Sequence, residues 1–267
     1  MALKELILSE IWIYPIKSLG GIRLEAANVL PKGLQYDRRW MLVDENGIFM
    51  TQRVHPTMAL FKVSWEQSQF VITYKESSIN LTLNSLSANA SEQVKIWNDT
   101  VHGVEVSPEH NAWFSEKLGV PCRLIYFPEE NPRPVDPEYN VNKENVSLAD
   151  GYPFLIIGQC SLNNLNSRLG NAIPMNRLRP NFVFSGGEPH EEDSWRNFSI
   201  GNIKFVGVKP SERCILINVD QETAQKGMEP LKTLSTYRKK DNKIYFGQNV
   251  VALDIGRVSV GDKIFLN

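Results

Sequence analysis

The sequence has few cysteines and histidines, and neither residue type is clustered. The three cysteines, Cys122, Cys160 and Cys214, lie far apart, and the four histidines show no HExxH or other metal-binding spacing. Zinc and iron–sulfur sites need clustered thiolates or imidazoles, so the sequence argues against a metal site built from protein ligands alone. The usual signatures of hydrolases, NTPases and dinucleotide-binding enzymes are also missing: a GxSxG elbow, a Walker loop, and a GxGxxG motif after a strand.

An excess of charge of one sign is absent as well. The 267 residues include 29 Lys+Arg and 30 Asp+Glu, a formal net charge of -1, so we expect no nucleic-acid partner. No hydrophobic run approaches the roughly 20 residues that cross a bilayer, and the N-terminus has no signal-peptide pattern. We therefore expect a cytoplasmic protein with no membrane partner, long enough for one large or two small domains.

Short runs of β-branched and aromatic residues, closed by turn residues, dominate the chain and are typical of a mainly β protein. Such runs occupy residues 6–17, 39–44, 59–65, 70–74, 79–83, 94–97, 101–106, 122–127, 154–158, 181–185, 198–208, 214–219 and 250–266. Helical spacing appears at 108–119, at 161–170 with Ser161 as the expected cap, and after Pro230. The pattern predicts an α+β barrel or sandwich with a few peripheral helices.

One segment interrupts this pattern. Residues 128–145 contain four prolines among charged residues, which predicts an exposed loop or a domain connection. We place the domain division next to it, with a β-rich N-terminal domain over 1–120 and a second domain over 121–267.

Three groups of polar residues stand at strand ends. In the first, Lys17 and Ser18 close the opening strand and Arg38 precedes the strand at Trp40. Two cations and a hydroxyl could converge there on one anion. The pattern alone favours the simpler interpretation, in which Lys17 and Arg38 are solvated strand-end charges.

In the second group, Arg179 precedes Pro180, which we expect to hold the arginine extended beside Asn181. A rigidly placed arginine suits recognition of phosphate or carboxylate. An ion pair with Asp193 or Glu192 is equally consistent with the pattern.

In the third group, Cys214 follows Arg213 at the mouth of an apolar strand. A neighbouring cation favours the thiolate form, which binds metals or attacks electrophiles. An inert buried thiol is the commoner role of a cysteine in such a strand, and we expect that role for Cys122 and Cys160.

Six segments in sequence order together resemble the MOSC family. They are Tyr14-Pro15-Ile16-Lys17-Ser18, Asp37-Arg38-Arg39-Trp40, Arg179-Pro180-Asn181, Glu192-Asp193-Ser194-Trp195, Arg213-Cys214-Ile215-Leu216, and Phe246-Gly247-Gln248 through Gly261-Asp262. Within that family the chain is similar to the stand-alone proteins with an N-terminal MOSC β domain, namely the mitochondrial amidoxime reducing components and their bacterial relatives. The resemblance runs from about Ile11 to the C-terminus.

The resemblance implies a MOSC-type β-barrel preceded by a β-rich domain, and it implies a molybdenum cofactor. In the family a pterin dithiolene supplies two sulfurs to molybdenum and one protein cysteine supplies another, so Cys214 would be the metal ligand and the catalytic residue. One protein ligand is then enough, because the cofactor brings the rest. The implied cofactor contacts are Lys17, Ser18, Arg38, Asp150, Gly151, Tyr152, Arg179, Asn181, Glu212, Arg213 and Asn249. Glu212 and Asn249 differ from the mammalian members.

The activity implied by the resemblance is reduction of N-hydroxylated compounds, such as amidoximes and hydroxylamines, by oxygen-atom transfer. Neither pyridoxal phosphate nor an iron–sulfur cluster is expected in this chain, so electrons would come from a separate ferredoxin-, flavodoxin- or cytochrome-type protein. The main alternative is a molybdenum cofactor carrier or sulfur-transfer protein, in which Cys214 carries a persulfide. A third alternative leaves Cys214 as a plain core thiol without metal.

Overall fold

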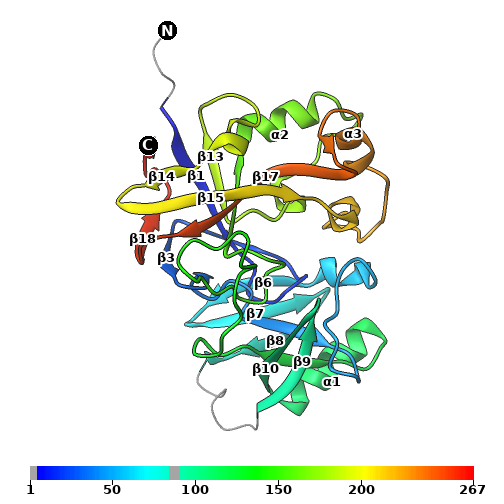
Figure 1. Ribbon diagram of the computed structural model, residues 1–267. Helices are drawn as coiled ribbons and strands as arrows, with labels where there is room; N and C mark the ends of the chain where they lie inside the picture. Colours follow the sequence, from blue (N-terminus) through cyan, green and yellow to red (C-terminus); the bar gives the residue numbers. More distant parts are fainter. Residues whose placement is uncertain (1–4, 84–90) are drawn as a thin grey trace.

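The computed structural model describes residues 5–83 and 91–267 of the chain, and strands dominate its secondary structure (Figure 1). The strands form a nine-stranded sheet, a four-stranded sheet and two three-stranded sheets. The prediction of a mainly β fold with a few peripheral helices is confirmed.

The nine-stranded sheet is built largely from the second half of the chain. Its strands, in spatial order, are β19 (Ile264–Leu266), β14 (Asn197–Ile200), β15 (Ile203–Glu212), β17 (Lys243–Ala252), β12 (Phe154–Gly158), β13 (Phe182–Ser185), β1 (Ile7–Ile13) and β2 (Ile22–Leu24), with β16 (Lys239–Lys240) paired to β17. Neighbouring strands are antiparallel except β12 and β13.

The smaller sheets hold most of the first half. The four-stranded sheet has the order β5 (Trp40–Val43), β11 (Arg123–Tyr126), β10 (Asp99–Glu105) and β9 (Ser91–Ile96). One three-stranded sheet contains β18 (Gly256–Ser259), β3 (Ala26–Leu30) and β4 (Gly33–Leu34), and the other contains β6 (Lys62–Glu66), β7 (Gln69–Tyr74) and β8 (Ser77–Leu81).

The helices lie at the periphery. In Figure 1, α2 (Gln159–Asn166) and α3 (Leu231–Ser235) lie over the nine-stranded sheet, and α1 (Pro108–Leu118) lies at the opposite end of the molecule. Local chemistry sets the ends of α1: the Ser107 hydroxyl accepts a hydrogen bond from the backbone N–H of His110, and Gly119 ends the helix at φ 71°. Short 3-10 turns include η1 (Pro56–Leu60), η3 (Met175–Arg177), η4 (Glu191–Ser194) and η5 (Ile215–Asn218).

Two predicted elements differ in the structure. Residues 214–219, predicted as a strand, form η5, because Ile217 N–H donates to Cys214 O and Val219 N–H to Leu216 O. The helix predicted to be capped by Ser161 begins earlier, after Gly158. The Ser161 hydroxyl instead donates to Glu192 Oε2 at 2.9 Å.

The two halves of the chain share sheets. β1 pairs with β13 and β3 pairs with β18, so the N-terminal segment enters sheets built from the C-terminal half. β11, which follows residue 120, pairs with β5 and β10. The domain division at residue 120 stays a prediction.

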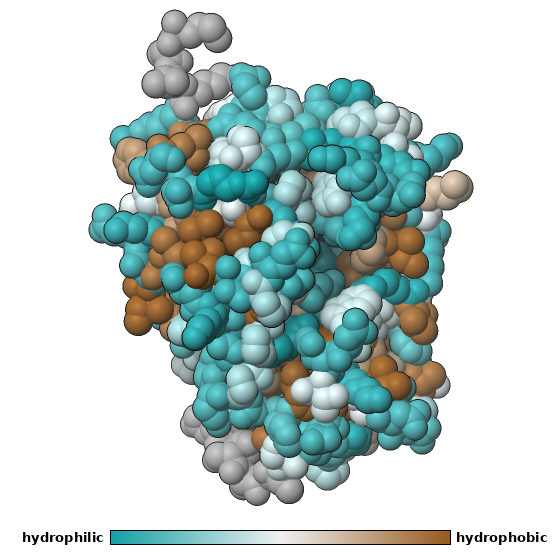
Figure 2. Space-filling view, in the orientation of Figure 1, coloured by the Kyte–Doolittle hydropathy of each residue, from teal (hydrophilic) through white to brown (hydrophobic). Residues whose placement is uncertain are grey.

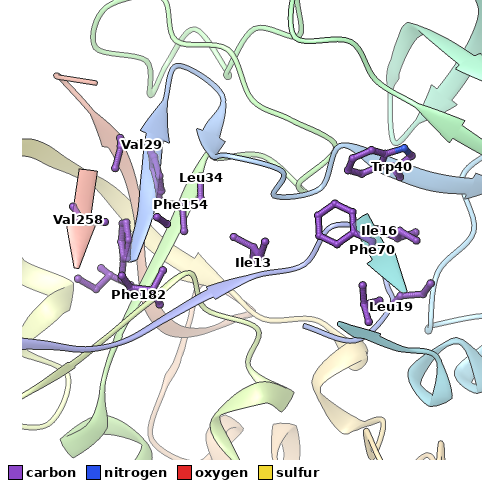
Figure 3. Packing of buried hydrophobic residues seen from close by; sticks show 14 of the residues in the cluster. Ile13, Ile16, Leu19, Val29, Leu34, Trp40, Phe70, Phe154, Phe182 and Val258 are labelled. Atoms are coloured by element: carbon purple, nitrogen blue, oxygen red, sulfur yellow. The ribbon is translucent and has the colours of Figure 1, made fainter. Parts of the chain in front are cut away.

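One hydrophobic core runs through this junction. In Figure 3, Phe154 and Phe182 lie at one end of this core and Trp40 and Phe70 at the other, with Ile13 between them. The rings of Phe154 and Phe182 stack with centroids 5.4 Å apart. Burial of apolar surface stabilises such contacts by roughly 25 cal/mol per Å², so the core fixes how the sheets lie against each other.

The surface is largely hydrophilic on the face shown in Figure 2, but a hydrophobic patch lies on its left side at the level of β15 and β18. Exposed hydrophobic residues in the β17–β18 connection include Leu253 and Ile255. None of the helices in the described part of the chain has the length and hydrophobicity that a bilayer crossing requires.

The segment after β1 connects the large sheet to the four-stranded sheet. The backbone N–H of Lys17 donates to Trp40 O at 2.7 Å, and the N–H of Trp40 donates to Pro15 O at 3.1 Å. These bonds fix where the side chains of Lys17 and Ser18 project, because β5 is held in turn by the core.

We predict that Phe182→Ala lowers the free energy of unfolding by about 3–5 kcal/mol, because Phe182 is 0% exposed and the substitution leaves a cavity. Phe265→Ala is the matched control, since Phe265 on β19 is 54% exposed; its effect should stay within about 0.5 kcal/mol. Urea unfolding measures both, and equal losses would contradict this description of the core.

Candidate functional site

A cavity of about 270 Å³ opens where the nine-stranded sheet meets the segment after β1. It brings together all twelve site residues selected from the sequence. Its lining includes Lys17, Ser18, Arg38, Asp150, Gly151, Tyr152, Arg179, Asn181, Glu212, Arg213, Cys214 and Asn249.

Sheet topology explains this convergence. β15, β17, β12 and β13 are consecutive neighbours in the large sheet. Segments adjoining these strands, together with the segments flanking β1 and β5, therefore meet at one place although they are distant in the sequence.

Lys17 is buried in the cavity wall, with 5% of its surface exposed. Its Nζ donates to Leu148 O at 2.9 Å and to Asp150 Oδ1 at 2.5 Å. Burial lowers the pKa of Lys17 to about 8, against the opposing effect of Asp150. The interpretation of Lys17 as a solvated strand-end charge is therefore wrong.

Arg38 is also fixed rather than solvated. Its Nη1 donates to Asp37 Oδ2 at 2.6 Å and to Asn181 Oδ1 at 3.3 Å, and its Nη2 donates to Arg179 O at 3.2 Å. The amide of Asn181 is used within the wall, because Oδ1 also accepts from Leu155 N and Nδ2 donates to Trp12 O. Asn181 thus positions Arg38.

Arg179 does not pair with either acid considered from the sequence. Asp193 pairs with Arg238, and Glu192 accepts hydrogen bonds from Gly158 N and the Ser161 hydroxyl. Arg179 Nη1 donates to Leu19 O at 2.8 Å, and burial lowers the pKa of Arg179 to about 10.

The backbone at Arg179 is left-handed, at φ 55°, rather than extended as expected from the following proline. The reason is local: the N–H of Arg179 donates to Asn176 O and so follows the turn of η3. Ser18 and Arg38, in the same cavity, also have positive φ, 67° and 51°. Such backbone costs of order 1 kcal/mol or more per residue and collects at functional sites.

Tyr14 lies between two arginines of the site. The guanidinium carbon of Arg179 is 4.1 Å from the centre of the Tyr14 ring, and that of Arg38 is 4.5 Å from it. Gly21 is required beside the ring, because a Cβ there would lie 2.5 Å from it. The sequence places Tyr14 in a motif but gives no sign of this stacking role.

Arg213 and Cys214 face the cavity from the end of β15. Arg213 Nη2 donates to Leu178 O at 2.6 Å and Nη1 to Ser211 Oγ at 3.3 Å. Its Nε is buried with no partner among the described residues. Burial lowers the pKa of Arg213, and the adjacent Cys214 opposes that shift.

The three cysteines differ in surroundings. Cys214 is half-buried in the cavity wall. Cys122 is buried against the Ser115 hydroxyl, 3.6 Å from its sulfur, and burial raises the pKa of Cys122. Cys160 is half-buried in α2 and donates to Gly186 O.

Some lining residues were missed in the sequence. Lys209 and Ser211 lie near the C-terminal end of β15, where its pairing with β17 shifts register. This irregularity has no clear signal in the sequence. The backbone N–H groups of Asp150, Gly151 and Tyr152 donate to no protein acceptor among the described residues, and they remain available to a ligand.

The charges in the cavity do not balance. Within residues 5–83 and 91–267, neither Arg179 nor Arg213 forms an ion pair, whereas Lys17 and Arg38 do. A buried cation without a counter-ion is costly, and an anionic ligand would relieve that cost. A thiol in the same cavity adds a soft metal donor. The arrangement suits a ligand that combines anionic groups with a thiophilic metal.

Comparisons with known proteins identify the family of the chain. Residues 5–121 match the family model of the MOSC N-terminal beta barrel domain, and residues 143–265 match that of the MOSC domain. The chain is 30% identical over 277 residues to human mitochondrial amidoxime-reducing component 1, covering 97% of this chain and 82% of that protein.

Two further relatives fall in different groups. Mitochondrial amidoxime reducing component 2 of Bos taurus is 31% identical, over 96% of this chain and 82% of its own length. A molybdenum cofactor sulfurase of Oryza sativa subsp. japonica is 30% identical over 92% of this chain but only 32% of its own length.

We predict that the cavity binds sulfate less tightly as the pH rises above 8. Lys17, whose pKa is lowered by burial to about 8, then loses its positive charge, while the charge of sulfate stays constant. Affinity should fall by up to about tenfold per pH unit, measured by isothermal titration between about pH 6.5 and 9.5.

Two variants control this experiment. Lys17→Met should bind sulfate more weakly at pH 7 and lose the decline above pH 8. Lys62→Met, which removes an exposed lysine paired with Glu222 outside the cavity lining, should behave like the unmodified protein. A decline that survives in Lys17→Met would contradict the assignment.

Proposed function

Since this chain belongs to the MOSC family, we propose that it is a molybdenum-cofactor-dependent oxidoreductase that reduces N-hydroxylated compounds, such as amidoximes and hydroxylamines. The observation that carries the proposal is a pair of arginines, buried Arg179 and half-buried Arg213, left without carboxylate partners in the described structure beside a cavity-facing thiol. The relatives named as amidoxime-reducing components support the choice of substrate class.

The residues present fit the proposed cofactor. Arg179, Arg213, Arg38 and Lys17 would bind its anionic groups, and the unpartnered Nε of Arg213 would gain an acceptor. Cys214 would bind the metal through its sulfur. When bound, the cofactor supplies two-electron oxygen-atom transfer at an N–O bond.

The remaining lining prepares the site for that ligand. Asn181 and Asp37 hold Arg38 in one orientation, and the Tyr14 ring contacts the guanidinium groups of both Arg38 and Arg179. Apolar side chains complete the wall: Phe154, Leu155, Leu178, Leu216 and Ile217. Preorganised charge in a cavity lined partly by apolar groups acts more strongly than in bulk water.

Reduction also needs two electrons per turnover. We propose that a separate redox protein of the ferredoxin, flavodoxin or cytochrome type supplies them. The match to a molybdenum cofactor sulfurase supports a second candidate function, in which this chain carries the cofactor or transfers sulfur without reducing substrate.

We predict that Cys214→Ala, prepared from a host that makes the cofactor, loses most of its molybdenum and at least about 99% of its benzamidoxime reduction, since the variant lacks the metal-binding thiol. Molybdenum per chain is measured by elemental analysis, and turnover is measured with an artificial electron donor.

Cys160→Ala is the matched control, because it removes a half-buried thiol that does not line the cavity. It should keep both the metal and the activity. Full metal and turnover in Cys214→Ala would contradict the proposal, and bound metal without turnover in the unmodified protein would favour the carrier function.

A further inference from the structure

Two carboxylates line the cavity, and they are held very differently. Asp150 accepts from Lys17 Nζ at 2.5 Å and from Trp97 Nε1 at 3.1 Å, and Arg53 lies 3.9 Å away. Glu212 has one described ion pair, with Lys243 at 3.0 Å. The Asp150 side chain is 59% exposed but has three partners, one of them the buried Lys17. Glu212 and Lys243 are each 52% exposed and Glu212 has no second described partner, so this pairing is weak and easily exchanged. Glu212 is therefore the carboxylate that is free to take a new partner.

Glu212 occupies the solvent side of the site. It is the last residue of β15 and pairs with Tyr245 of β17 across the sheet. Cys214 follows it two positions later in the sequence. The intervening Arg213 turns its guanidinium to the wall, onto Leu178 O and Ser211 Oγ. The exposed part of the lining thus contains a carboxylate whose described counter-ion is the exposed Lys243, whereas Lys17 and Arg179 are buried.

This separation of charge argues against Glu212 as a cofactor ligand. The buried arginines favour an anionic group in the interior, and a carboxylate would repel that group. Glu212 instead suits a ligand part that is cationic or rich in N–H donors and that reaches the thiol from solvent. Amidines have this character, because their two nitrogens form a planar fork that pairs with both oxygens of a carboxylate.

We propose that Glu212 forms a subsite that binds the amidine-type headgroup of ligands at the mouth of the cavity, with Lys243 as the cation displaced when such a ligand enters. The inference rests on the proposed function and deepens it. An amidoxime would donate its NH₂ group to Glu212. The amidine product is more basic and therefore cationic, so it would bind Glu212 more tightly than the amidoxime does.

Benzamidine and benzamide test this subsite, because they share shape but only benzamidine carries the cationic fork. Each is titrated calorimetrically into protein prepared from a cofactor-competent host. We expect benzamidine to bind more tightly than benzamide. Glu212→Gln should weaken benzamidine binding by about tenfold or more, the usual scale for losing a charge-assisted pair, and should leave benzamide binding unchanged.

Lys243→Gln supplies an independent readout. Removing the competing ammonium should tighten benzamidine binding by several-fold, a change that a merely structural role of Glu212 would not produce. Glu222→Gln is the matched control, because it removes another carboxylate from an exposed ion pair, with Lys62 at 2.7 Å, away from the cavity lining. Its benzamidine affinity should equal that of the unmodified protein.

Unchanged benzamidine affinity in Glu212→Gln, or weaker benzamidine binding in Lys243→Gln, would overturn the subsite.

Molybdenum content and benzamidoxime turnover are measured on the same preparations. If the unmodified protein holds metal and turns over while Glu212→Gln binds benzamidine normally, only the subsite fails. If it holds no metal, the proposed function fails, and the titrations still decide the subsite because they need only the carboxylate.

Discussion

The burial of positive charge without a matching negative charge is the constraint on which the site depends. Arg179 and Arg213 lie in a wall where burial lowers the pKa of each guanidinium, and no described carboxylate pairs with either. Such groups destabilise the free protein unless carbonyl oxygens and ring faces compensate for the lost water. Leu19 O, Leu178 O and the Tyr14 ring perform that role. The remaining imbalance is the feature on which our proposal of an anionic ligand rests.

The fold places these cations together because segments that are distant in the sequence meet over a rigid core. β1 belongs to the nine-stranded sheet, yet the segment after it is bonded to Trp40 in β5. The ends of β15 and the approach to β13 meet that segment in the cavity. The left-handed backbone at Ser18, Arg38 and Arg179 is held by hydrogen bonds: Ser18 O accepts from Gln52 Nε2, and the N–H groups of Arg38 and Arg179 donate to Tyr14 O and Asn176 O. The stability of the core thus offsets the cost of the strained backbone at the site.

The sequence allowed much of this site to be predicted, because short motifs carried the identities of the lining residues. Elements with clear local signals could also be predicted, such as α1, which lies between its N-cap Ser107 and Gly119. Other features depend on contacts that the local sequence does not contain. Lys17 contacts Leu148 and Asp150, which are more than a hundred positions away in the sequence. The local pattern around Lys17 therefore predicts an exposed strand-end lysine. The turn η5 likewise replaces a predicted strand at 214–219, because only Val219 finds a bridging partner there, in Lys226.

We propose that a ligand held by the cations of the cavity places a metal on Cys214. Alkylation of the cysteines with iodoacetamide, followed by mass spectrometry, tests it directly on the unmodified chain. Protein from a cofactor-competent host should be alkylated at Cys214 much more slowly than protein from a host without cofactor synthesis, while Cys160 reacts equally in both. Equal reactivity of Cys214 in the two preparations, with molybdenum present in the first, would show that Cys214 does not bind the metal.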